Sequence, residues 1–160
     1  MRKTIALALA LVFVLLLSAC GRKEAYRSDV SVEALAQAVE QSVEVNGLAV
    51  MTEAYVSGMM RMDTSLFEEY LVKISVYGSS IDEYGIFKSP DEGGVDGVKA
   101  QAEAYLLLRK ETWMEEYLPE EKPKLTQAAV KTCGQYVIYV ILGDDARQKA
   151  LDAFENALKA

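Results

Sequence analysis

The chain has 160 residues, of which 51% are hydrophobic and 26% are charged, with a formal net charge of −7 and no histidine. This composition is typical of a globular chain of one-domain size, and its acidic balance argues against nucleic acid as a partner. The lack of histidine excludes Ser-His-Asp and Cys-His catalytic sets and the usual zinc ligand sets, so we expect no metal and no cofactor. Only two cysteines are present, which excludes a small disulfide-stapled scaffold.

The N-terminus has the layout of a secretory signal. Arg2 and Lys3 precede an uninterrupted apolar run of 13 residues from Ile5 to Leu17. A helix of that length spans about 20 Å, which is short of the ~30 Å hydrocarbon core of a bilayer. The run therefore predicts a cleaved signal peptide over residues 1–19 rather than a permanent membrane span.

The residues Leu17-Ser18-Ala19-Cys20 resemble a bacterial lipobox. That resemblance implies cleavage before Cys20, a diacylglyceryl thioether on Cys20, and a lipid-anchored protein on the extracytoplasmic face of the cell membrane. Two or more acyl chains would anchor the protein stably. The alternative is an ordinary signal peptide in which Cys20 stands by chance. Cleavage would remove two basic residues and no acid, which moves the net charge from −7 to −9.

The remaining chain divides into a tether and one domain. Residues 20–29 are polar and too few to fold alone, so they predict a lipidated tether, and residues 30–160 predict a single extracytoplasmic domain. The tether contains three basic residues, Arg22, Lys23 and Arg27. They could be attracted to an anionic membrane leaflet, or they could contribute only to solubility.

The first half of the domain predicts one helix and one hairpin. A helical apolar stripe is followed by Asn46-Gly47 as a stop; its members are Val32, Leu35, Ala36, Val39 and Val43. Residues 48–62 show no clean period and predict an irregular or weakly helical segment. Ser65 with Glu68 predicts a capping box for a single turn. Alternation over residues 71–77 predicts a strand, with residues 84–88 as its hairpin partner.

The second half predicts a helix, a hairpin and a final helix. Ser89-Pro90-Asp91-Glu92 predicts the start of a long helix that ends at Leu118-Pro119. Its buried stripe is predicted to be Val98, Ala102, Tyr105, Leu106, Arg109 and Trp113. Two strands are predicted over residues 128–133 and 136–142, and Gly134-Gln135 between them suits a type II′ turn. Such a turn fixes the pairing of the strands: Cys133 with Tyr136, Thr132 with Val137, Lys131 with Ile138 and Val130 with Tyr139. Asp144 or Asp145 then caps a helix with the apolar face Ala150, Leu151, Phe154 and Leu158.

These elements predict an α+β fold. We expect an antiparallel sheet of about four strands, arranged as two hairpins and packed with about three helices, in addition to the N-terminal signal helix.

Several motifs of the second half are similar to a family of small Gram-positive bacterial lipoproteins that is defined by a domain of unknown function. They are Glu83 to Lys88 (EYGIFK), Arg109, Tyr117-Leu118-Pro119, Ala128-Ala129-Val130, Gly134-Gln135-Tyr136-Val137 and Asp144-Asp145. The similarity covers roughly residues 62–158, and the glycine-rich start of the long helix departs from it. The resemblance implies an extracytoplasmic lipoprotein and supplies no catalytic residues.

No residue type in the sequence is assigned a catalytic role. Tyr117 would need a nearby cation to act as a base and is better explained as packing at a helix end. The acidic pairs, explained as solvated helix ends, are Glu115-Glu116, Glu120-Glu121 and Asp144-Asp145. Cys133 is the one thiol that remains if Cys20 is lipidated, and we interpret it as a structural thiol, with a reactive exported thiol as the alternative.

The final strand, residues 136–142, is apolar on both faces, which is the most informative pattern for binding. If the helices cover one face, the other carries a mixed polar and aromatic patch. We predict an interaction surface there that comprises Tyr77, Lys131, Tyr136, Ile138 and Val140, with Lys73 and Cys133 beside it. The alternative is that the 48–62 segment or one helix covers this face.

The leading functional hypothesis is a non-catalytic, membrane-anchored binding or protein-interaction module in the cell envelope. Its partners would be the membrane, through the lipid on Cys20, and an envelope protein or small ligand that the sequence does not identify. The rival hypothesis is an envelope hydrolase or transferase that uses carboxylate or tyrosine side chains.

Overall fold

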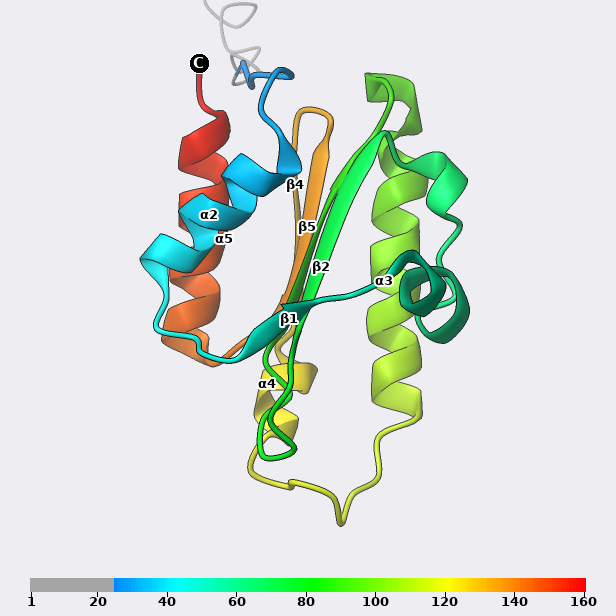
Figure 1. Ribbon diagram of the computed structural model, residues 1–160, viewed down its shortest axis with the longest axis vertical. Coiled ribbons are helices and arrows are strands. Elements are labelled where there is room, and N and C mark those ends of the chain that lie inside the picture. The colour runs from blue at the N-terminus through cyan, green and yellow to red at the C-terminus, as the bar shows by residue number, and fades with distance from the viewer. Residues whose placement is uncertain (1–24) are drawn as a thin grey trace, which may run out of the picture.

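The computed structural model describes residues 25–160, which form a five-stranded antiparallel sheet with helices on both faces (Figure 1). The strands are β1 (Leu48–Val50), β2 (Glu69–Ser75), β3 (Glu83–Lys88), β4 (Ala129–Cys133) and β5 (Tyr136–Ile141), in the spatial order β1-β2-β3-β5-β4. The helices are α2 (Val32–Ser42), α3 (Val95–Glu111), α4 (Lys122–Thr126) and α5 (Asp144–Leu158). The predicted α+β class is confirmed. The predicted signal peptide and Cys20 lie outside the described residues.

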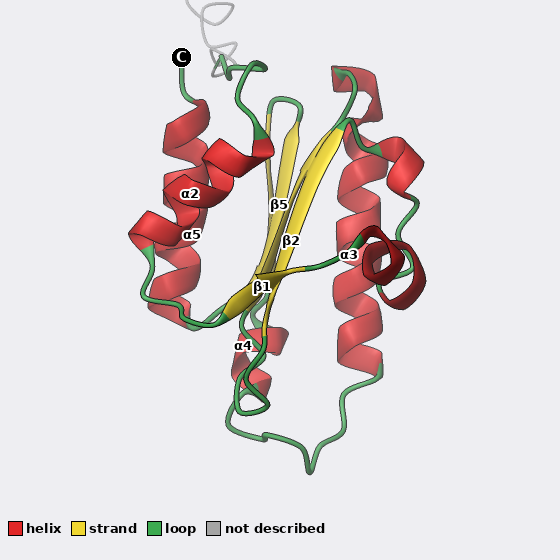
Figure 2. Cartoon of the chain, viewed as in Figure 1, coloured by secondary structure: helices red, strands yellow, loops and turns green. Residues whose placement is uncertain are grey.

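The sheet lies between two helical layers (Figure 2). Helices α2 and α5 cover one face, and α3 covers the other together with the chain between β1 and β2. Each face has its own core. The α3 side is centred on Val98, Ala102, Tyr105, Val137, Tyr139 and Ile141, and the α2/α5 side on Leu35, Val39, Ile86, Ile138, Val140 and Phe154. Strands β3 and β5 are buried along their whole length because both faces are covered.

The predicted β4–β5 hairpin is confirmed residue by residue. Cys133 pairs with Tyr136 and Val130 with Tyr139, as the two-residue turn requires. Gly134 has a φ of +56°, and the φ of Gln135 is not positive. A positive φ at the first central residue alone is the pattern of a type II′ turn. The β2–β3 hairpin is also present, and it pairs Val72 with Gly85.

The start of α2 follows local capping, whereas two predicted helix starts are corrected. Helix α5 has Gly143 at its N-cap without a side-chain cap, and Asp144, a predicted cap, is its first helical residue. Ser31 caps α2 by accepting a hydrogen bond from the Ala34 amide at 3.2 Å, and α2 ends at Ser42, before the predicted stop. Asp91, rather than Ser89, accepts the first amide of the next helical segment, from Gly94 at 2.9 Å. A 3₁₀ turn over Glu92–Gly94 therefore precedes α3.

The segment predicted to be irregular contains more structure than its pattern indicates. Residues 48–50 form the edge strand β1, and Tyr55–Met59 form a π-helical turn. The short turn after it is capped by Asp63, not Ser65, since the Ser65 amide donates to the Asp63 carboxylate at 3.1 Å. The long helix α3 ends at Glu111, before the predicted end at Leu118-Pro119. Helix α4, which has a proline in its first turn, was not predicted either.

Residues 25–29, placed in the predicted tether, contact the domain. Tyr26 forms an isolated β-bridge with Lys159, and the Arg27 amide donates to the Leu158 carbonyl at 2.8 Å. The Tyr136 hydroxyl donates to the Val30 carbonyl at 2.7 Å. The first described residues thus lie beside the C-terminal end of α5 (Figure 1). Within residues 25–160, no helix combines the length and hydrophobicity that a membrane crossing needs.

We predict that Gly134→Val lowers the free energy of unfolding by about 1–3 kcal/mol, because a β-branched residue at positive φ is strained. A Cβ there would also lie 3.0 Å from the Tyr26 Cβ. Gly97→Ala is the matched control: a Cβ at this position in α3 meets no atom within 4 Å, so the variant should gain up to ~1 kcal/mol. Urea denaturation followed by circular dichroism measures both. Equal stability of the two variants would contradict the turn assignment.

Candidate functional site

The predicted interaction surface is mostly core. Tyr136, Ile138 and Val140 are completely buried, because α2 and α5 both pack on the face that was expected to be open. The prediction of an exposed binding patch is therefore wrong for these three residues, and the alternative, that helices cover this face, is the one observed. Lys131 is half-buried and forms an ion pair with Glu155 of α5. Only Tyr77, which is 55% exposed in the β2–β3 connection, lies at the surface.

The other predicted neighbours of that surface are also held by the covering helices. Lys73 forms an ion pair with Glu40 of α2, and the Tyr84 hydroxyl donates to the same carboxylate at 2.8 Å. Cys133 is buried, and burial raises the pKa of its thiol, which disfavours the reactive thiolate.

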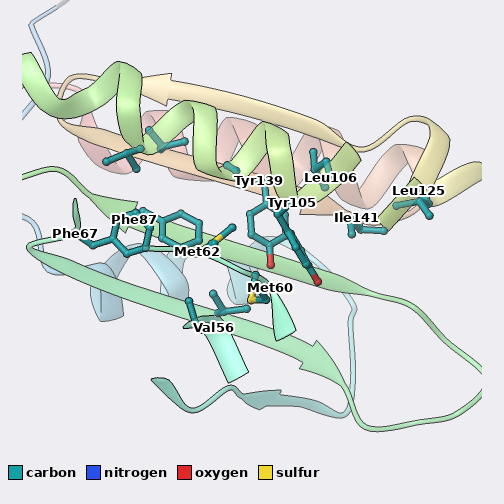
Figure 3. Packing of buried hydrophobic residues seen from close by; sticks show 14 of the residues in the cluster. Val56, Met60, Met62, Phe67, Phe87, Tyr105, Leu106, Leu125, Tyr139 and Ile141 are labelled. Atoms are coloured by element: carbon teal, nitrogen blue, oxygen red, sulfur yellow. The ribbon is translucent and has the colours of Figure 1, made fainter. Parts of the chain in front are cut away.

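The convergent polar groups of the described chain lie on the opposite face, around Glu83. Glu83 is the first residue of β3, and its side chain is completely buried beneath α3. The Tyr139 hydroxyl donates to Glu83 Oε1 at 2.6 Å, and Arg109 of α3 places a guanidinium nitrogen 3.5 Å from Glu83 Oε2. The Tyr105 ring packs edge-on against the Tyr139 ring with centroids 5.4 Å apart, and Figure 3 shows both hydroxyls on the same side.

A glycine makes this arrangement possible. Gly85 is paired with Tyr139 in the sheet, and a Cβ on Gly85 would lie 2.4 Å from the Tyr139 ring. The ring therefore lies across β3 in space that only glycine leaves free. Its hydroxyl reaches Glu83, two residues earlier on the same strand.

The electrostatics of the cluster are dominated by burial. Removal from water raises the pKa of Glu83, and this effect exceeds the opposing influence of Arg109 and of the Tyr105 and Tyr139 hydroxyls. Burial and the neighbouring Glu83 raise the pKa of Tyr139 far above its usual range, so that hydroxyl keeps its proton and remains a donor.

Three buried polar atoms near α3 have no hydrogen-bond partner among the described residues. They are Glu83 Oε2, Arg109 Nε and Trp113 Nε1. Unsatisfied buried groups each cost on the order of 1–3 kcal/mol, so they are uncommon without a compensating role. Arg109 lies in the last turn of α3, and Trp113 follows just after the helix ends at Glu111.

Next to this cluster the surface carries a cavity of about 250 Å³, which we name the Tyr55–Arg109 hollow. It is lined by Tyr55, Met59, Arg61, Tyr105, Leu108, Arg109 and Thr112. Tyr105 and Arg109 belong both to its wall and to the Glu83 cluster, so the buried carboxyl lies directly behind the wall.

The backbone around the hollow is unusual on the side opposite α3. Tyr55 and Met59 are the ends of the π-helical turn, and Arg61 has a φ of +59°, in the left-handed region that a long side chain adopts only at a cost. π-helical turns and strained residues both occur preferentially at functional sites. Their coincidence at one hollow makes it the candidate binding site.

Two other hollows have weaker chemistry. The larger, about 510 Å³, lies where α2 ends and α5 begins, and its charged wall residues Asp144, Asp145 and Lys149 are exposed side chains. A hollow of about 310 Å³ lies between α3 and β4 and is lined largely by aliphatic groups. None of the three unsatisfied buried atoms of the described chain belongs to a residue that lines either hollow. Within residues 25–160, no three acidic or cysteine side chains come together as a metal site would require.

The arrangement can bind and orient a ligand, whereas direct proton transfer by Glu83 is blocked by its burial. Sequence analysis did not predict this site. Arg109 lies along the predicted stripe of α3 but is half-buried rather than buried. A partly buried arginine still needs an acidic partner, which is the signal that could have identified Glu83.

We predict that Glu83→Gln weakens the pH dependence of stability. A carboxyl whose pKa is raised by folding binds its proton more tightly in the folded chain, so the free energy of unfolding falls as pH rises above about 4.5, by ~1.4 kcal/mol for each unit of pKa shift. The glutamine side chain of the variant would not titrate, and its amide oxygen could still accept from Tyr139.

Thermal melts between pH 4.5 and 8 measure this dependence. As pH rises, the melting temperature of the wild type should fall relative to that of Glu83→Gln. Glu116→Gln, which changes an exposed acid, should run parallel to the wild type. Parallel curves for Glu83→Gln would show that Glu83 is ionised throughout this range.

Comparison with known proteins gives one match. A family model described as Domain of unknown function (DUF4358) matches residues 41–142, well over half of the chain. The matched region runs from the end of α2 through β5 and contains Glu83, Arg109 and the whole Tyr55–Arg109 hollow. No curated protein and no solved structure matches the chain. On its sequence the chain belongs to the family defined by this domain of unknown function.

Proposed function

We propose that the protein is a lipid-anchored, extracytoplasmic binding module that holds a small ligand in the Tyr55–Arg109 hollow. The observation that carries the binding role is the coincidence of a π-helical turn, a left-handed arginine and the unsatisfied buried Nε of Arg109 at this one hollow. The anchor rests on the sequence alone, through the lipobox residues 17–20 behind the 13-residue apolar run.

The rigidity of the wall supports a binding role. Arg109 and Leu108 project from the 17-residue helix α3, whose opposite face is packed into the core. On the other wall, the Met62 amide donates to the Val56 carbonyl at 3.2 Å and the Met60 amide donates to the Tyr55 carbonyl at 3.1 Å, which fixes the chain around Arg61. A preformed wall reduces the entropy that a ligand loses on binding.

An envelope hydrolase or transferase is the second candidate. The observation in its favour is the raised pKa of Glu83, since catalytic acids are commonly carboxyls of this kind. Against it, Glu83 has no exposed surface and does not line the hollow, so a substrate could not touch it without movement of Arg109 or Tyr105. We therefore favour binding over catalysis.

For the anchor, we expect the mature protein to begin at Cys20 with the mass of a diacylglyceryl group, as measured by mass spectrometry of the chain extracted from membranes. Cys20→Ala should abolish the modification and change processing. Cys133→Ala is the matched control, because this buried thiol should not affect processing. An unmodified N-terminal cysteine, or cleavage at another position, would reject the anchor.

For the binding role, we expect small fragments to locate to the hollow. In heteronuclear NMR spectra of the full chain with a fragment library of mixed charge, the largest shift changes should fall on Tyr55, Leu108 and Thr112. Met59→Trp, which adds an indole at the wall, should reduce these changes. Leu107→Trp changes a similarly exposed side chain of α3 outside the hollow and should not. Fragments that bind only elsewhere would reject this site.

A further inference from the structure

We infer that the ligand of the Tyr55–Arg109 hollow is a small organic oxyanion, with a carboxylate or phosphate group held between Arg61 and Arg109 and an apolar or aromatic body against Leu108 and Met59. This inference rests on the proposed binding function and adds the chemical class of the ligand to it.

The charge of the wall is the first argument. The hollow is lined by two guanidinium groups and by no acidic side chain. The chain as a whole has 24 acidic and 17 basic residues and is therefore negatively charged. A lining with two basic side chains and no acidic one is the opposite of this overall charge. Cationic walls in a partly desolvated cavity concentrate anions.

The pairing of basic side chains is the second argument. Within residues 25–160, nearly every lysine and arginine has an acidic oxygen within 4.0 Å, and the exceptions are Arg61 and Lys110. In this part of the chain Arg61 is thus an exposed, unpaired cation whose backbone is held in a strained conformation at the rim of the hollow. An ion pair with a ligand would supply the partner that the described chain does not.

The state of Arg109 is the third argument. Its only ion pair among the described residues is the 3.5 Å approach to Glu83, and its Nε is buried without a hydrogen-bond partner. This ion pair contains no hydrogen bond, because Glu83 Oε2 also has no hydrogen-bond partner among the described residues. The planar guanidinium offers donors in a fixed fork that matches the two oxygens of a carboxylate or phosphate.

The size and lining of the hollow limit the rest of the ligand. A volume of about 250 Å³ corresponds to roughly eight water molecules at ~30 Å³ each, enough for one ring and one anionic group. Met59 is 68% exposed and Leu108 is half-buried, so an apolar body would cover side chains that now face water. Thr112 adds a hydroxyl at the same wall.

Titration of the full lipidated chain in a neutral detergent tests the inference. The probes are phenyl phosphate and benzoate, with phenol as the neutral probe of the same ring. Fluorescence of Trp113, the one tryptophan in the chain, reports binding beside Thr112, and calorimetry gives the dissociation constant. We expect at least one anion to bind ten or more times more tightly than phenol.

Matched variants separate a site from general charge attraction. Arg61→Gln should weaken anion binding at least tenfold and leave the melting temperature unchanged, since Arg61 is exposed and has no ion pair within residues 25–160. Lys110, the other basic residue of that range without an ion pair, lies outside the hollow. Lys110→Gln removes the same charge and should change the affinity for the anion less than threefold. If a short-chain phosphatidylglycerol competes with the anionic probe, a lipid headgroup is the source of the oxyanion. If it does not compete, the natural ligand is a soluble oxyanion.

Other results would overturn the inference. Equal weakening by Arg61→Gln and Lys110→Gln, or anions binding no better than phenol, would reject the oxyanion class. If neutral or cationic fragments bind in the hollow and anions do not, the ligand class fails while the proposed binding site stands. If no probe of any charge binds there, both fail together.

Discussion

Burial of β3 and β5 on both faces is the constraint on which the rest of the molecule depends. Each strand has six residues and none is exposed, so each must be covered on two sides. Along β3, Tyr84 and Ile86 point into the α2/α5 core, while Phe87 points into the α3 core. A polar residue on such a strand must find its partners within the protein, and this requirement brings Glu83 together with Tyr139 and Arg109.

Local chemistry explains which parts of the fold could be predicted. The β4–β5 register follows from the two residues of its turn and was correct. Helical spacing also predicted the buried stripe of α3 correctly from Val98 to Leu106, but Arg109 is half-buried and Trp113 lies beyond the end of the helix. Periodicity shows which side of a helix is apolar but not which face of the sheet it covers. For that reason α2 and α5 were not expected on the face of Tyr136 and Ile138. The apolar pattern of β5 on both of its faces was the signal of two-sided burial.

The candidate site was harder to predict because its parts are distant in sequence. Glu83 and Arg109 come from a strand and a helix 26 positions apart, and Tyr55 and Arg61 come from a segment without a clear period. Each residue has an ordinary appearance alone: an acid at the start of a strand, an arginine in a helix, a tyrosine in a loop. Only the packing of α3 over β3 and the π-helical turn places them together. Tyr117, which the sequence made conspicuous, lies in the connection between α3 and α4, and its hydroxyl donates to the Gly78 carbonyl at 3.1 Å.

The bridge between Tyr26 and Lys159 would limit how far the domain can move from the proposed anchor. With the lipid at Cys20 as proposed, the chain before the first described residue is residues 20–24, which reach at most about 17 Å. A free tether over residues 20–29 would reach about twice that distance and sweep roughly eight times the volume. With that attachment, the β4–β5 turn and the C-terminal end of α5 would lie on the side of the domain nearest the anchor, and α4 would lie at the far end (Figure 1). A domain attached in this way would stay in the layer of the envelope next to the membrane.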